Sequence, residues 1–197
     1  MIFSTLKFPS RIRLISFLSA LLLAGSLLVE AREITYPEGT SIVLDITQAP
    51  YNADATGVED VGPIIEQAVN DSLAQAGPAG SEAAPFVYFP NGRYRIATPV
   101  VLETETPGGP WRMLQGQSRD GVVLFSDEND PDLQDVDNPT ALISYFEGDW
   151  TNNAFTLLFE NFTVEIGAGN PGAVGVRFHG NNVARMENVI IRSLDPD

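Results

Sequence analysis

The sequence predicts an all-β fold of the solenoid type, in which short strands stack coil upon coil behind one N-terminal capping α-helix. Three observations lead to this prediction. One helical pattern occurs early in the chain, the residues after it form only strand and turn patterns, and a short motif recurs near the end. With 44% hydrophobic residues among 197, the chain has enough apolar material for one packed core.

The first 31 residues have the features of a cleavable secretion signal. Three basic residues among the first thirteen precede an apolar run from Leu14 to Val29. Val29 and Ala31 then place small residues where a signal peptidase needs them for a cut after Ala31. Because the run is shorter than the roughly 20 residues that cross a bilayer, we favour a removed signal over a retained anchor. We therefore expect a signal peptide over residues 1–31 and a secreted protein, extracellular or periplasmic, with no membrane attachment after cleavage.

The rest of the chain is strongly acidic. Three of the eleven basic residues and one of the 26 acidic residues lie in the signal, which leaves eight basic and 25 acidic residues and a net charge of −17. Such a surface repels phosphate backbones, so we expect no nucleic-acid partner. The chain has no cysteine and one histidine, which excludes thiol catalysis and metal sites built from thiolates or several imidazoles.

Residues 61–76 carry the helical pattern. Apolar residues recur there at helical spacing, namely Val61, Ile64, Ile65, Ala68, Val69, Leu73 and Ala76. Asp60 is the predicted N-cap, Pro63 lies in the first turn, where its missing N–H costs nothing, and Gly77-Pro78 ends the helix. Before the helix, residues 32–60 are rich in turn formers, with an edge strand predicted at Ser41–Leu44.

Short apolar segments bounded by Gly, Pro, Asn or Asp follow the helix. The predicted strands are Phe86–Phe89, Tyr94–Ile96, Val100–Leu102, Arg112–Leu114, Val122–Phe125, Ala141–Tyr145, Phe155–Phe159 and Val174–Phe178.

The repeated motif aligns Phe159–Glu165 with Met186–Arg192 at an offset of 27 residues. Apolar residues share the first, fourth and sixth positions of both copies, and the second and third positions are identical Glu-Asn pairs. We expect Asn161 and Asn188 to form a ladder of stacked amides at a coil corner. Two ordinary strands can match in this way by chance, so the solenoid needs further support.

That support comes from a resemblance to a known family. Tyr51–Asp60, then the amphipathic helix, then Val87–Ile96 resemble the opening region of the pectate-lyase superfamily, of the rhamnogalacturonase/epimerase-like type. In that family a short glycine-containing loop and a helix cap the first coil of a right-handed parallel β-helix. Met113–Gly116 and the two Asn motifs resemble its later coils. This chain has fewer glycines in the opening loop than is usual for the family.

The resemblance implies that residues 32–197 form the N-terminal capping region and first coils of such a β-helix. A period of about 27 residues after residue 86 allows only about four coils, and a solenoid needs a cap at each end. We therefore expect the natural chain to continue, with the catalytic residues largely beyond the given sequence.

The resemblance implies an extracellular polysaccharide-active protein, a lyase or glycoside hydrolase on pectin-like or other acidic glycans. A lyase of this family would use calcium and an arginine or lysine base. The alternatives are a non-catalytic secreted or surface β-helix that binds glycans, like an adhesin or spike, and a purely structural solenoid. A fold alone does not decide among them.

Three residues are candidates for facing the substrate. Arg177 and Arg192 are expected to point outward from strands, where a guanidinium could meet an anionic sugar. His179 follows the Arg177 strand and precedes a turn, so it is also accessible. For each of them the alternative is an ordinary exposed polar residue.

No metal site is predicted. Six acids between residues 127 and 137 could supply oxygen ligands for calcium, but their spacing matches neither a helix-loop-helix calcium site nor a glycine-rich calcium repeat, and a solvated loop is favoured. Asp195 and Asp197 follow the last strand, where family hydrolases can place acids, and a simple turn is favoured there too. Aromatic residues such as Trp111, Trp150 and Tyr145 could stack on sugars, but aromatics more often fill a solenoid interior.

Overall fold

The computed structural model describes residues 33–76, 83–102, 111–145, 156–180 and 182–196. All of them belong to one compact unit, residues 31–197. The predicted signal peptide and Trp150 lie outside the described residues. No helix in the described part of the chain is long and apolar enough to cross a membrane.

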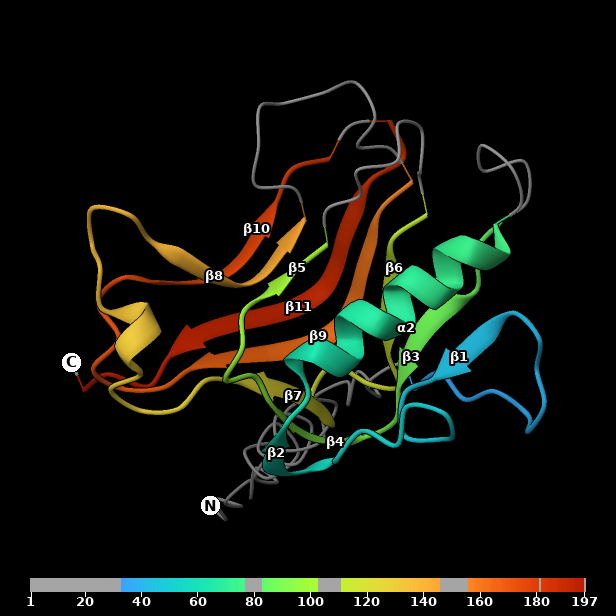
Figure 1. The fold of residues 1–197 in the computed structure, drawn as a ribbon, viewed down its shortest axis with the longest axis horizontal. Helices are drawn as coiled ribbons and strands as arrows, with labels where there is room; N and C mark the ends of the chain where they lie inside the picture. Colours follow the sequence, from blue (N-terminus) through green and yellow to red (C-terminus); the bar gives the residue numbers. More distant parts are fainter. Residues whose placement is uncertain (1–32, 77–82, 103–110, 146–155, 181, 197) are drawn as a thin grey trace, which may run out of the picture. The chain divides into compact units, whose positions relative to one another are not determined.

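Parallel strand pairs build the unit, and they fall into three ladders (Figure 1). The first ladder contains β1 (Val43–Asp45), β3 (Phe86–Phe89), β6 (Met113–Gly116) and the first half of β9 (Leu158–Ile166). The second contains β2 (Thr56–Asp60), β4 (Gly92–Arg95), β7 (Val122–Phe125) and the second half of β9. The third contains β5 (Val100–Val101), β8 (Thr140–Tyr145) and β10 (Ala173–Phe178).

The long strand β9 joins the first two ladders, and β11 (Arg185–Ser193) pairs with it along its whole length. Phe159 lies opposite Met186, Phe162 opposite Val189 and Val164 opposite Ile191, which confirms the alignment of the sequence repeat. The fold is therefore mostly β, with parallel strands that curl around a buried core in the manner of a half-barrel. This arrangement is consistent with a parallel β-helix.

The coil corner within β9 and β11 is formed by the two repeated asparagines. Asn161 and Asn188 both have positive φ, 63° and 52°. Asn188 Nδ2 donates to Asn161 Oδ1 at 2.7 Å, and Asn161 Nδ2 donates to the Gly116 carbonyl at 3.1 Å. The predicted asparagine ladder is confirmed. A Cβ atom at Gly116 would lie 2.1 Å from the Asn161 carbonyl oxygen, which explains why glycine ends β6.

Apolar side chains from successive strands stack in register inside the ladders. Val87, Leu114 and Phe159 form one such stack in the first ladder. Tyr94, Leu124 and Val164 form another in the second, and all three are fully buried. A series of ring contacts links the two stacks: Phe159 with Phe162 at 4.4 Å, Phe162 with Phe89 at 5.1 Å, and Phe89 with Tyr94 at 5.5 Å. Tyr145 is buried as well, in line with an interior role for the aromatics.

One α-helix, α2 (Gly62–Gln75), packs against β3 and β5 among the described elements (Figure 1). Ile65, Ala68 and Val69 enter the main core, while Ile64 and Leu73 are only partly buried against it. The centre of the apolar face predicted from helical spacing is therefore buried in the core. The helix joins the core beside β3, the second strand of the first ladder, and β5, the edge strand of the third.

Two local predictions were wrong. The residue at the N-cap is Val61 rather than Asp60; the Asp60 carboxylate instead accepts from the backbone N–H groups of Gly62 and Ala97, both at 3.0 Å. Asp60 ends strand β2, in a segment where the resemblance implied a loop. Strand β2 pairs with β4. It was not predicted because its residues are mostly turn formers with little apolar pattern.

Candidate functional site

Arg177 lies on the outer side of the third ladder, beside a pocket of about 510 Å³. It is in register with Ser144 of β8, and its guanidinium donates to the Pro139 carbonyl at 2.7 Å. The other residues that line the pocket are Pro99, Val101, Asp137, Asn138, Pro139 and Thr140. A guanidinium, an amide and a hydroxyl next to apolar proline surface are groups that can hold a carboxylated sugar.

Arg192 lies in a different sheet and is paired. On the outer face of the second ladder, it forms an ion pair with Glu165 of β9, directly opposite in register. Arg93 of β4 donates to the other oxygen of the same carboxylate at 3.0 Å, and its guanidinium lies 4.6 Å from the centre of the Phe125 ring. Glu165 therefore links three strands through two arginines.

The electrostatics of this row favour the ionised acid. Burial by itself raises the pKa of Glu165, but hydrogen bonds from Arg192 and Arg93 outweigh it, so the pKa lies below its ordinary value. Both guanidinium groups are half exposed, whereas the Glu165 side chain is almost fully buried. The ion pair with Glu165 neutralises the charge of the Arg192 guanidinium and fixes its position, while about half of the side chain stays accessible to solvent.

His179 is exposed and directly follows β10. It is not among the residues that line the Arg177 pocket. The structure therefore does not gather the three predicted residues into one site: Arg177 and His179 belong to the third ladder or its end, and Arg192 belongs to the second.

The acidic segment 127–137 is held by local hydrogen bonds and by an ion pair to β4. Asp127 forms an ion pair with Arg95, whose hydrogen bond lowers the pKa of this carboxyl. Asp130 is buried and accepts from the Asp132 N–H at the start of a short 3-10 helix, Pro131–Leu133. The Asp135 carboxylate accepts from two backbone N–H groups just after it. Within the described ranges, no group of three or more His, Asp or Glu could hold a metal ion.

Asp195 has a comparable local role. Its carboxylate accepts from the Gly169 N–H at 2.7 Å and from the Ser193 hydroxyl at 2.8 Å, and these bonds lower its pKa. The favoured interpretation of a turn agrees with this geometry. Asp197 lies outside the described residues.

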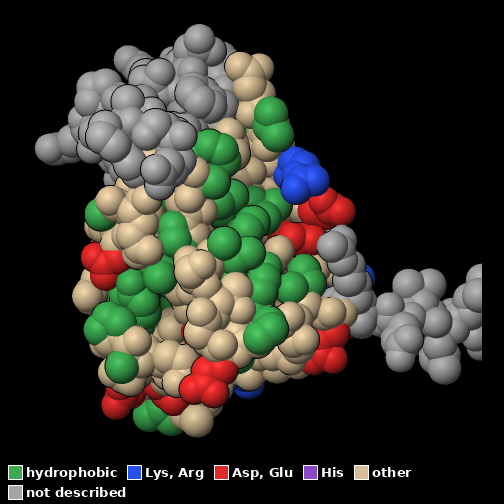
Figure 2. Space-filling model, turned by 90° about the vertical axis from the view of Figure 1, so that its right-hand side faces the viewer, with side chains coloured by type: hydrophobic (Ala, Val, Ile, Leu, Met, Phe, Trp, Pro, Cys, Tyr) green, Lys and Arg blue, Asp and Glu red, His purple; other side chains and the backbone are tan. Residues whose placement is uncertain are grey.

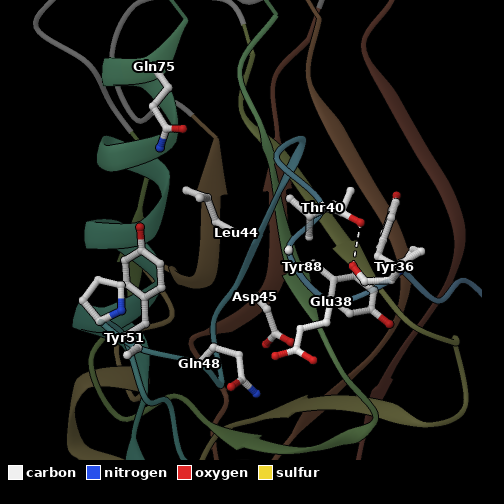
Figure 3. Close-up of a pocket in the computed structure, with 14 residues that line it drawn as sticks. Tyr36, Glu38, Thr40, Leu44, Asp45, Gln48, Tyr51, Gln75 and Tyr88 are labelled. Atoms are coloured by element: carbon white, nitrogen blue, oxygen red, sulfur yellow. Dashed lines mark hydrogen bonds between the residues drawn. The ribbon is translucent and has the colours of Figure 1, made fainter.

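A larger pocket, of about 760 Å³, was not predicted (Figure 3). Three tyrosines line it: Tyr36 from the N-terminal segment, Tyr51 from the loop after β1, and Tyr88 from β3. The rings of Tyr36 and Tyr88 meet edge to face at 5.2 Å. Nothing in the local sequence pattern could reveal this pocket, because residues from three separate segments come together only in the folded chain.

The hydroxyl groups of these tyrosines bond to the protein. Tyr51 donates to Asp71 of α2 at 3.1 Å, and Tyr88 donates to the Ile34 carbonyl at 2.8 Å. Burial, together with the hydrogen bond to Asp71, raises the pKa of Tyr51 to about 12. Burial and the nearby charge of Asp45 raise the pKa of Tyr88 to about 12. Both phenols therefore stay neutral at physiological pH, and what they offer the pocket is ring surface.

Comparison with known proteins gives one family. A model of the family described as rhamnogalacturonase A/epimerase, pectate lyase-like, matches residues 49–196. A solved structure, ORF18 of Geobacillus virus E2, is similar at 18% identity with a TM-score of 0.41. The match covers 78% of this chain and 25% of the viral one, so the chain spans about a quarter of that protein's length. No curated protein matches the chain.

Proposed function

Because the chain belongs to the rhamnogalacturonase A/epimerase, pectate lyase-like family, we propose that it acts outside the cytoplasm on pectin-like or other acidic polysaccharides. The observation that carries the proposal is the family match over residues 49–196, the same part of the chain that holds nearly all of the parallel ladders. The fold in full is proposed to be a right-handed parallel β-helix. Exposed Ile191 and Met186, which stand in register over buried Val164 and Phe159, would then receive a further coil.

The Arg177 pocket is the proposed contact with the acidic glycan. Its guanidinium, with Asn138 and Thr140 beside it, suits a uronate carboxylate, and the proline surface suits the sugar ring. Asp137 is the one acid among the lining residues. His179, just after β10, and Arg192, on β11, remain proposed glycan contacts apart from this pocket.

The reaction itself is a lyase or hydrolase reaction, with catalytic groups largely outside these 197 residues. The proposal agrees with the outer face of the second ladder, where the described charged groups pair with one another: Glu165 with Arg93 and Arg192, and Asp127 with Arg95. A lyase of this family would use calcium. The described carboxylates offer no set of three ligands, so no step of the proposal runs through that ion.

The test is binding of polygalacturonate, with neutral dextran as the comparison. The chain is expressed with its own leader, and the secreted protein is analysed by affinity electrophoresis. We expect polygalacturonate to be bound and Arg177→Ala to weaken binding about tenfold, as for the loss of one charged hydrogen-bond partner. Arg119→Ala is the matched control, because Arg119 is paired with Asp120 in a turn away from the pocket.

The proposed contact would be contradicted if dextran slowed the protein as much as polygalacturonate does, or if Arg177→Ala bound polygalacturonate with unchanged affinity. Arg177→Lys separates charge from geometry, because lysine keeps the charge and loses the fork of donors. Ultraviolet absorbance of unsaturated product identifies a lyase. Binding without any product, in a chain that includes all its coils, is the result expected of a non-catalytic binder.

Export is proposed from the leader alone. Residues 1–31 should be removed, so the N-terminal sequence of the secreted protein should begin at Arg32. Recovery of the chain in the membrane fraction with Met1 intact would exclude cleavage.

A further inference from the structure

The tyrosine-lined pocket carries negative charge with no basic side chain to balance it. Of its 14 lining residues, Glu38 and Asp45 are acids and none is Arg, Lys or His. Figure 3 shows both carboxylates pointing into the same space. Asp45 accepts from the Thr47 N–H and hydroxyl, at 2.8 and 2.7 Å, through Oδ1 alone, so Oδ2 is available to a ligand.

The walls around these carboxylates are aromatic and apolar. In Figure 3, Tyr51 lies on the helix side and Tyr36 and Tyr88 on the other, with Leu44 between them. A ring face attracts a cation and also packs against the C–H face of a sugar. The pocket therefore combines charge and aromatic surface of the kind that binds an organic cation.

Polar groups at the rim suit a ligand with hydroxyls. Gln48 and Gln75 contribute amides and Thr40 contributes a hydroxyl, and Gln75 points from α2 toward the pocket in Figure 3. Amides both donate and accept, so they can pair with sugar hydroxyl groups. The volume, about 760 Å³, lies within the range of pockets for small molecules.

We propose that this pocket binds a sugar unit that carries a protonated amine, the amine between Glu38 and Asp45 and the ring against tyrosine. An anionic uronate is disfavoured here, since the two acids would repel it and no basic residue lines the pocket. A bare metal ion is disfavoured too, because calcium needs about six to eight oxygen ligands, whereas these walls are aromatic.

The surrounding surface agrees with a cationic ligand. Figure 2 views the molecule from the side of Figure 1 on which β1 lies. Acidic side chains lie around the left, lower and right-hand edges of this face, its middle is hydrophobic and uncharged, and basic side chains are few. A field of this sign raises the local concentration of a positively charged glycan. The inference is independent of the acidic-polysaccharide proposal, which concerns the third ladder.

Titration calorimetry of the secreted protein, at about pH 6 where a sugar amine is protonated, tests the inference with three disaccharides. The probes are the glucosamine disaccharide, its N-acetylated counterpart and the galacturonic acid disaccharide. We expect the amine form to bind, and the acetylated form to bind at least about tenfold more weakly because it lacks the charge. Any heat from the uronate should be the same in Glu38→Gln as in the parent, because its proposed site is the Arg177 pocket.

Isosteric variants locate the binding. Glu38→Gln and Asp45→Asn should each weaken binding of the amine form about tenfold. Glu59→Gln removes the same charge from an exposed acid outside the pocket and should keep the affinity. Thermal unfolding of each variant checks the fold; should Asp45→Asn unfold, Glu38→Gln alone decides, because Glu38 is exposed and lies in the N-terminal segment.

Equal affinity for the amine and acetylated forms, unchanged affinity in Glu38→Gln, or no binding of the amine form would each overturn the inference. Binding of polygalacturonate is measured on the same protein. If the protein still binds polygalacturonate but does not bind the amine disaccharide, only the assignment of this pocket has failed.

Discussion

At the scale of single residues, the buried corner asparagine Asn161 shows how a side chain decides a backbone turn. Its φ of 63° places it in the left-handed region, which asparagine tolerates better than most residues. Its amide group satisfies the Gly116 carbonyl on one coil and the Asn188 amide on the next. Conformation and hydrogen bonding therefore require the same residue type at this position.

Replacement of Asn161 by alanine should lower the free energy of unfolding by about 2–4 kcal/mol. The change removes the donor to the buried Gly116 carbonyl. It also leaves alanine at a positive φ with no side-chain hydrogen bond to offset the strain. Urea unfolding measures the difference. Asn161→Gly should lose less than the alanine variant because glycine adopts this φ freely.

Asn188→Ala is the control for this prediction. Asn188 has positive φ as well but is exposed, so its loss should cost about 1–2 kcal/mol, less than the loss of the buried amide. Equal losses in Asn161→Ala and Asn188→Ala would show that burial of the amide does not set the cost.

At the scale of elements, helix α2 is the α-helix that packs against the strands of the ladders. It places fully buried Ile65 in the same core as strand residues Val87 and Val100. Ser72 on the same helix donates to the Pro85 carbonyl at 2.5 Å, which ties the helix to the segment just before β3. The helix therefore covers apolar side chains that the first strands would otherwise expose to water.

Ile65→Ala should destabilise the protein by about 2–5 kcal/mol, because it removes buried methylene groups and leaves a cavity. Gln67→Ala, on the exposed side of the same helix, should change stability by less than about 0.5 kcal/mol. Thermal and urea unfolding of both variants measure the contrast. A loss below about 0.5 kcal/mol in Ile65→Ala would mean that the helix is not part of the cooperative core.

At the scale of the whole molecule, acidity has two opposite effects. The net charge of −17 after signal removal destabilises the compact state through self-repulsion, and lower pH relieves this. The opposite effect comes from carboxylates whose pKa is lowered in the folded state, because their ionised form stabilises the fold. Asp60, Asp127 and Glu165 are among them. Their stabilisation is fully present above the unfolded carboxyl pKa of about 4 and is lost as pH falls through the lower folded values.

Glu165→Gln isolates the second effect. The variant should be less stable than the parent at neutral pH, because it loses the ion pairs to Arg93 and Arg192. The difference should shrink as the pH falls through the folded pKa of Glu165, since the parent carboxyl then becomes protonated as well. Unfolding in urea from pH 7 to pH 3 gives the two curves, with exposed Glu59→Gln as the control. A difference that stays constant over this range would contradict the role of ionised Glu165.

The elements themselves were largely predictable from the sequence. Helical spacing from Val61 to Ala76 predicted α2 to within a residue at each end, and apolar segments predicted β3 and β7 at their observed bounds. The Asn repeat predicted the register of β9 and β11. Strand β2 escaped prediction, because Thr56–Asp60 has little apolar pattern and forms its strand by pairing with β4.

The candidate sites were less predictable, because ligand contacts depend on which segments meet in space. Composition alone excluded thiol chemistry and predicted an acidic surface, and the ordered motifs predicted the family. Only the tertiary structure paired Arg192 with Glu165, set Arg177 beside Pro139, and enclosed a pocket with Tyr36, Tyr51 and Tyr88. Periodicity and composition are local properties that a sequence carries by itself, whereas charge pairing and cavity walls arise from residues brought together across tens of positions.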